Sequence, residues 1–113
     1  MMVAVPSPAV GRRIATALLD EHLCACVQIV GPITSHYDWQ GKRQRSREWL
    51  LWIKTRSGLA AHVTRTVAAL HPYEVPEIVG MPLHPVYRPY LNWLESLVPP
   101  QAPDRRRRST RRP

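Results

Sequence analysis

The chain has 113 residues, of which 44% are apolar, and it carries a formal net charge of +8 at pH 7. That length suits one compact domain, and no apolar run approaches the roughly 18 to 20 residues that a membrane-spanning helix needs. Six arginines and one aspartate give residues 99–113 a net charge of +5, so the rest of the chain is only mildly basic and does not indicate a nucleic-acid-binding domain.

The first part of the chain predicts a strand, a helix and a second, interrupted strand. Residues 2–5 are short, apolar and β-branched, which favours a buried strand. Ser7-Pro8 is typical of a helix start, with a hydroxyl cap before proline, and the apolar stripe that follows predicts about four turns. Strand-like residues return over 25–30 and 33–39, and Gly31-Pro32 between them predicts a bulge or bend.

The middle of the chain predicts a hairpin with long arms. Gln40-Gly41 signals a tight turn, residues 42–47 form a polar tip, and residues 48–54 form an apolar strand. Arms that reach past a small body usually contact a neighbouring subunit. We therefore expect the hairpin to take part in assembly.

The remaining elements complete an α+β pattern. Ser57-Gly58 caps a second helix, and His71-Pro72 ends it because the residue before proline resists the helical region. Residues 77–81 predict a fourth strand, and Pro89 opens a short final helix. The order predicts a ferredoxin-like βαββαβ sandwich with an extra C-terminal helix, as a domain over 1–98 followed by a disordered Arg/Pro-rich tail over 99–113.

Several strings in the chain are specific enough to be recognised together. They are LCACV from residue 23, GPITS from 31, YDWQGK from 37, KTR from 54, HPYEVPE from 71 and YLNWL from 90. In this order they resemble the CutA family of divalent-cation tolerance proteins over about residues 3–98. The resemblance implies a homotrimer of ferredoxin-like subunits, with the hairpin arms paired to strands of neighbouring subunits. It also implies a non-enzymatic role in the response to metal ions, with copper binding.

A second function stays open beside metal tolerance. The implied trimer is similar in architecture to PII-type signalling proteins, so the chain is alternatively a sensor or scaffold that binds a small molecule at the subunit interface. The five glycines are scattered and form no Walker or dinucleotide motif. We therefore expect no catalytic residues and no organic cofactor.

Three residues are candidate metal ligands: His71, Glu77 and Cys26. His71 and Glu77 bracket a turn with two prolines, and imidazole plus carboxylate is a partial site for copper or another divalent ion. A metal site normally needs three or four ligands, so Glu74, His36 or a neighbouring subunit would supply the others. Alternatively, His71 only ends the helix and hydrogen-bonds locally.

The two cysteines, Cys24 and Cys26, are expected on one face at the start of a strand. A thiolate pair suits a soft ion such as Cu(I), but a cysteine in an apolar strand is more often a small buried hydrophobe, and we expect Cys26 in the core. A disulfide between them would be badly strained, and residues 1–6 lack the basic start of a secretory signal. The expected location is the cytoplasm.

Aromatic residues suggest a second kind of site. Aromatic side chains on hairpin arms are enriched in protein interfaces, although Trp49 and Trp52 equally fit simple core packing. The candidates for lining a ligand pocket in a cleft between subunits are Tyr37, Trp39, Lys54, Tyr73 and Trp93. The expected partners are further copies of the chain and a metal ion, with no membrane and only weak, salt-dependent contact of the Arg-rich tail with nucleic acid.

Overall fold

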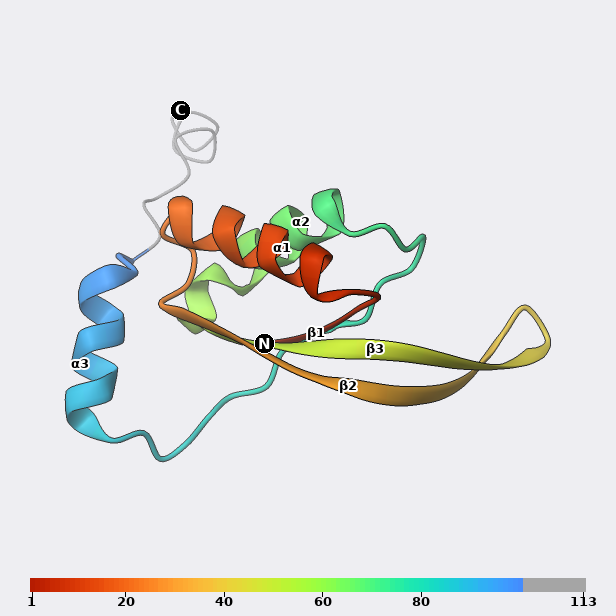
Figure 1. Ribbon diagram of the computed structural model, residues 1–113. Helices are drawn as coiled ribbons and strands as arrows, with labels where there is room; N and C mark the ends of the chain where they lie inside the picture. The colour runs from red at the N-terminus through yellow and green to blue at the C-terminus, as the bar shows by residue number, and fades with distance from the viewer. Residues whose placement is uncertain (101–113) are drawn as a thin grey trace, which may run out of the picture.

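The computed structural model describes residues 1–100, which fold into a four-stranded sheet and three α-helices (Figure 1). The strands are β1 (Met2–Val5), β2 (Cys26–Trp39), β3 (Lys42–Lys54) and β4 (Ile78–Val79). The helices are α1 (Pro8–Asp20), α2 (Ala60–Leu70) and α3 (Arg88–Leu97). The strands are all antiparallel in the order β2-β3-β1-β4, and α1 and α2 cover one face of the sheet. The predicted α+β sandwich with an extra C-terminal helix is confirmed.

The core lies between this face and the two helices. Most of its fully buried side chains come from alternate positions of β1 and β3 and from one stripe of each of these two helices, namely Val3, Val5, Leu51, Ile53, Ile14, Leu18, Val63 and Val67; Val98, just after α3, is fully buried as well. α1 begins as expected, because Ser7 Oγ accepts a hydrogen bond from the Val10 N–H at 3.2 Å. Each buried Leu, Ile or Val side chain contributes about 1.5–3 kcal/mol through loss of water contact.

The β2–β3 hairpin extends well beyond this core (Figure 1). β1 pairs with β3 only as far as Trp49, so within residues 1–100 the outer part of the hairpin has no third strand beside it. The predicted bulge is confirmed between Val30 and Ile33. Glycine is required there because a Cβ on Gly31 would lie 2.5 Å from Cδ1 of Trp49.

The polar stretch of residues 42–47, expected as the tip of the hairpin outside the strand 48–54, is instead part of β3. Gln40 and Gly41 have φ values of +51° and +76°, as a two-residue hairpin turn requires, so the strands stay paired up to Trp39 and Lys42. The sequence did not predict that β3 extends to Lys42, because neither face of the outer hairpin is covered by the core. Its side chains are therefore not obliged to alternate between apolar and polar.

Two further expectations are corrected. Ser57 and Gly58 form a short 3₁₀ turn (Ser57–Leu59), and no side chain caps α2. The fourth strand is Ile78–Val79 rather than residues 77–81: it pairs only with Met2 and Val3 of β1, the next β1 carbonyl, that of Ala4, is bonded to His71 instead, and prolines flank the segment. The end of α2 at Leu70, with His71 as its cap, is as expected.

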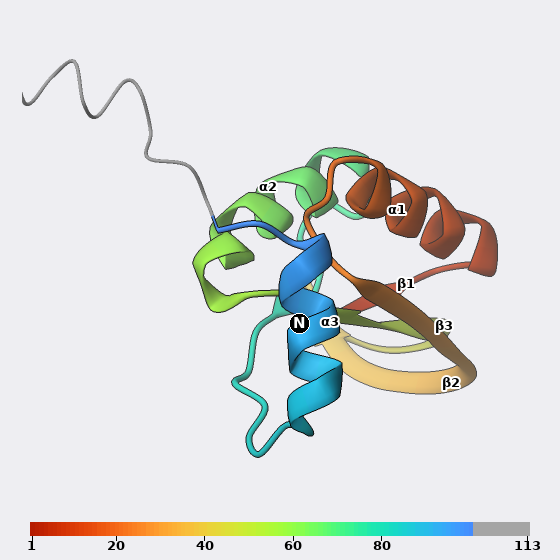
Figure 2. The same ribbon diagram turned by 90° about the vertical axis from the view of Figure 1, so that its left-hand side faces the viewer.

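Helix α3 lies at the end of the sheet opposite the hairpin turn (Figures 1 and 2). Leu94 is buried, and the Arg56 guanidinium donates to the carbonyls of Glu95 and Val98. Tyr90, Trp93 and Leu97 remain exposed. Among residues 1–100, none of the helices has both the length and the apolar character needed to cross a membrane. Most of the predicted disordered tail, residues 101–113, lies outside the described part of the chain.

Candidate ligand pocket

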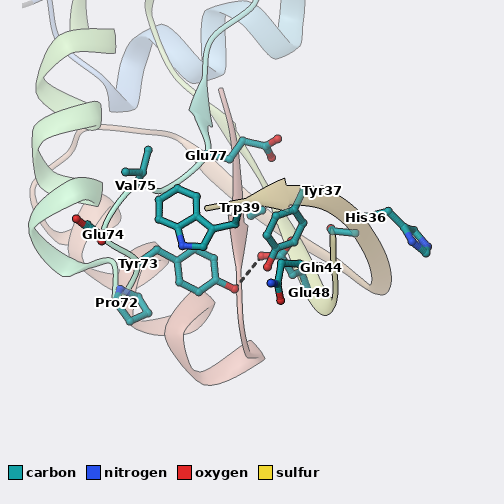
Figure 3. A pocket seen from close by; sticks show the side chains of 12 residues that line it. His36, Tyr37, Trp39, Gln44, Glu48, Pro72, Tyr73, Glu74, Val75 and Glu77 are labelled. Carbon is teal, nitrogen blue, oxygen red and sulfur yellow. Dashed lines mark hydrogen bonds between the residues drawn. The ribbon is translucent and has the colours of Figure 1, made fainter. Parts of the chain in front are cut away.

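A pocket of about 740 Å³ lies between the outer hairpin and the segment that follows α2; we call it the hairpin pocket (Figure 3). Its volume falls within the range of about 300–1,000 Å³ that is typical of small-molecule sites. The lining residues are Ala4, Ser35, His36, Tyr37, Trp39, Gln44, Glu48, Pro72, Tyr73, Glu74, Val75 and Glu77. The pocket thus forms where β1 ends and the hairpin continues past it.

His71 fixes one wall of the hairpin pocket to the sheet. Its Nε2 lies 2.7 Å from the carbonyl oxygen of Ala4, and its Nδ1 accepts a hydrogen bond from the Tyr73 N–H at 3.1 Å. Because Nδ1 accepts, Nε2 carries the proton and donates it to Ala4. The pairing of β1 with β4 has already stopped at Val3, so this imidazole takes the place of a strand partner for Ala4.

A hydrogen bond between Tyr73 and Glu48 joins the segment after α2 to the hairpin, which forms the opposite wall of the pocket. Glu48 is only 6% exposed, and its Oε2 accepts a hydrogen bond from the Tyr73 hydroxyl at 2.8 Å (Figure 3). Burial, and then the neighbouring Glu48, raise the pKa of Tyr73 well above its usual value of 10.0, so the phenol keeps its proton and donates. Within residues 1–100, Glu48 has no cationic partner, which is costly for a buried carboxylate.

Three of the five predicted pocket residues meet in this cavity. Tyr37, Trp39 and Tyr73 line it together, and the Tyr37 hydroxyl is hydrogen-bonded to Ser46 Oγ at 2.6 Å. The other two do not reach it in the single chain. Lys54 lies at the base of the hairpin and donates to Gln28, and Trp93 packs against Tyr90 on α3 with ring centroids 5.6 Å apart.

The predicted metal ligands are separated in the single chain. Among the residues described, no three His, Cys, Asp or Glu side chains lie close enough to hold a metal ion. Both ring nitrogens of His71 are already used, Glu77 lines the hairpin pocket, and Cys26 begins β2 half-buried. A metal site completed by a neighbouring subunit stays a prediction.

The roles expected for the cysteines are partly reversed. Cys24 rather than Cys26 lies in the core, because β2 begins at Cys26 and Cys24 belongs to the turn before it. Burial, with a smaller effect of Cys26, raises the pKa of the Cys24 thiol to about 11. Both cysteines are free thiols, and the two are not placed as a pair on one strand face.

Sequence reasoning missed Glu48, the most buried acidic residue of the described chain. The sequence contains a signal for its burial. Glu48 is the first residue of the apolar run EWLLWIK and lies two residues before Leu50, on the same strand face. The pattern placed it only as the first residue of an apolar strand. Its actual position is set by Tyr73, 25 residues away in the chain.

Comparison with known proteins agrees with the fold. The chain matches the family described as CutA1 divalent ion tolerance protein over residues 1–97. It is 47% identical over 94 residues to the divalent-cation tolerance protein CutA of Thermus thermophilus, covering 83% of this chain and 91% of the relative. It is 41% identical over 97 residues to a CutA homolog of Xenopus laevis, covering 86% of this chain but only 64% of the relative, so it spans less than two thirds of that protein.

Solved structures lead to the same result. The T. thermophilus protein superposes with a TM-score of 0.79 over 82% of this chain and 90% of its own. The PII-like protein CutA of Nostoc sp. PCC 7120, in its apo form, is 30% identical and has a TM-score of 0.78 over 86% of this chain and 93% of its own. The family resemblance found in the sequence is therefore confirmed, and the chain belongs to the CutA1 divalent ion tolerance family.

Proposed function

We propose that this chain forms a cytoplasmic homotrimer that takes part in the response to divalent cations by binding a ligand in the hairpin pocket, without catalysis. The observation that carries the proposal is the pocket itself, a cavity of about 740 Å³ whose wall holds the buried Glu48 without a cationic partner in the described chain. The similarity to divalent-cation tolerance proteins supports the biological role.

Exposed apolar side chains support self-assembly. β2 is an edge strand of 14 residues, and unpaired edges of that length are normally covered. Large apolar side chains exposed in the single chain include Ile29, Val30, Trp39, Met81, Leu83, Tyr87 and Trp93. Folded monomers rarely leave so much apolar surface in water, and a homotrimer built on the hairpin arms would cover it.

Copper is the first candidate ligand. Carboxylate groups suit divalent ions, and Glu48 and Glu77 line the hairpin pocket, whereas the ring of His36 points away from the other lining side chains (Figure 3). Since these groups do not form a three-ligand cluster within residues 1–100, a neighbouring subunit would have to complete the site.

A small organic molecule is the second candidate, as in a PII-like sensor. The aromatic rings of Tyr37, Trp39 and Tyr73 line the pocket, and aromatic walls with a few polar groups are typical of small-molecule sites. Both candidates use the same cavity. They differ in whether oxygen and nitrogen donors or aromatic rings supply the affinity.

The test is light scattering of the full chain, followed by calorimetric titration with Cu²⁺. A trimer that binds Cu²⁺, and binds it at least tenfold more weakly after Glu77→Ala but not after Glu95→Ala on exposed α3, supports copper as ligand. A trimer without copper affinity favours the small-molecule sensor. A monomer contradicts the proposed assembly.

A further inference from the structure

We propose that the hairpin pocket recognises an organic cation, either an ammonium or a guanidinium group. This inference rests on the proposed function, because it names the ligand class of that same site. It is carried by three features of the described residues: the charges that line the pocket, the aromatic rings beside them and the directions taken by the neighbouring basic side chains.

The lining is acidic in a chain that is basic overall. The acidic residues Glu48, Glu74 and Glu77 are among those that line it, and no lysine or arginine of the described residues does so. Glu48 matters most, because it is nine-tenths buried and only its Oε2 is held, by Tyr73. No hydrogen bond within residues 1–100 reaches Oε1, which is therefore free to accept from a bound donor.

Strand alternation keeps the three arginines of β3 on the other face of the hairpin. Successive side chains of a strand point to opposite faces, and directly paired residues of two strands share one. The pocket face of β3 carries Lys42, Gln44, Ser46 and Glu48, of which Lys42 lies beside the turn and does not line the pocket, and the opposite face carries Arg43, Arg45 and Arg47. Arg43 pairs with Asp38, and the Arg47 guanidinium lies 5.7 Å from the centre of the Trp49 ring. These arginines therefore do not neutralise Glu48 within the chain.

The aromatic rings select an organic cation over a metal ion. The pocket face of β2 presents Tyr37 and Trp39, and Tyr73 adds a third ring from the opposite wall. The face of an aromatic ring attracts ammonium and guanidinium groups, most strongly where water is excluded. A bare metal ion instead needs several donors converging on one point, and the described residues contain no such cluster.

The same chemistry has two sources. One is a free small molecule. The other is an arginine side chain of this chain, since residues 105–112 contain six arginines outside the described part of the structure. The experiment must therefore separate a free cation from the chain's own tail.

The test is calorimetric titration of the full-length protein with agmatine, which carries both an ammonium and a guanidinium group, and with choline, at constant ionic strength. Citrate serves as the anionic control and is titrated into the full chain with its six tail arginines replaced by glutamine, because the tail itself attracts anions. We expect saturable binding of at least one cation and none of citrate. Glu48→Gln, which keeps shape but removes charge, should weaken binding at least tenfold, whereas Glu95→Gln should leave it unchanged.

A second pair of variants tests the rings. Trp39→Leu should weaken binding at least tenfold, whereas Trp39→Phe should retain most of it because it keeps an aromatic face. Light scattering of each variant confirms that assembly is unchanged. Equal affinity in the parent, Glu48→Gln and Trp39→Leu proteins, or preference for citrate, overturns the proposal.

Replacing all six tail arginines with glutamine in the full chain identifies the source. Tighter agmatine binding in that variant means that the tail occupies the pocket, and unchanged binding means that a free cation does. Absence of cation binding in both proteins overturns the inference. If Cu²⁺ still binds at the pocket, only the organic-cation proposal fails; if no ligand binds there, the proposed function fails as well.

Discussion

The Tyr73 hydroxyl donates a hydrogen bond to Oε2 of Glu48 across 2.8 Å and so joins the segment after α2 to the hairpin. This bond crosses the hairpin pocket, so its strength affects both the stability of the fold and the shape of the site. The phenol stays protonated because burial and the adjacent carboxylate both raise the pKa of Tyr73.

Tyr73→Phe should lower the free energy of unfolding by about 1–3 kcal/mol, because a buried carboxylate oxygen loses its donor. Urea denaturation at a fixed protein concentration measures the change, since assembly links stability to concentration. Tyr87→Phe is the matched control, because Tyr87 is 77% exposed, and it should change the value by less than about 0.5 kcal/mol. Equal effects of the two changes would contradict the role given to Tyr73.

Gly31→Ala should destabilise the hairpin by about 1–3 kcal/mol, because the added Cβ would lie 2.5 Å and 2.9 Å from two atoms of the Trp49 ring. Thermal unfolding of the variant measures the loss. Gly58→Ala is the control: nothing lies within 4 Å of its Cβ, and the change should be neutral or slightly stabilising. A neutral Gly31→Ala would mean that the Trp49 ring moves aside freely.

The stability of the fold should fall as the pH rises from 9 to 11. Burial raises the pKa of the Cys24 thiol from 9.0 to about 11, so the folded state keeps a proton that the unfolded state releases. The contribution is fully present below pH 9 and decreases above it, by about 1.4 kcal/mol for each unit between the two pKa values.

Urea denaturation at pH 8.5 and pH 10 tests this dependence. Cys24→Ala should flatten the fall between these values, whereas Cys26→Ala should leave most of it in place, because burial of Cys24 is the main cause of the shift. Tyr73 adds a decrease of the same sign above pH 10, so the comparison stops there. An equally steep fall in Cys24→Ala would assign the effect to another group.

His71→Ala should release the segment after α2 from the sheet, because it removes both the donor to Ala4 and the acceptor for the Tyr73 N–H. We expect faster hydrogen exchange at the Tyr73 amide and a loss of about 1–3 kcal/mol in unfolding free energy. His62→Ala on α2 is the control and should change neither.

The same variant separates the two interpretations of His71. If His71 is structural, copper affinity should change little in the assembled protein. A drop in copper affinity of tenfold or more, with the Tyr73 amide still protected, would instead identify His71 as a metal ligand.

Local signals predicted most of the fold. Ser7 and Pro8 mark the start of α1, and Gly31 marks the bulge, because capping and close backbone approach depend on residues near in sequence. The limits of β3 and β4 were less predictable. They depend on contacts across the fold: β4 pairs only with Met2 and Val3, since the carbonyl of Ala4 beyond them is bonded to His71.

The candidate site was predictable only in part. The aromatic residues of the hairpin arms pointed to Tyr37 and Trp39, and Tyr73 was proposed with them as a residue of the same pocket. Glu48 was missed because its burial depends on a contact with Tyr73 across the fold. Lys54 was included although the strand carries it away to the base of the hairpin.

Because side chains alternate between the two faces of β3, the number of residues in the hairpin turn decides which charged side chains face the pocket. Gln40 and Gly41 are the only residues between the paired Trp39 and Lys42, so they set which side chains of the two arms face each other. Inserting one residue into β3 between Glu48 and the core would turn the outer arm over and bring Arg43, Arg45 and Arg47 to the cavity side. A single-residue insertion or deletion along the arm would therefore invert the charge that a ligand meets.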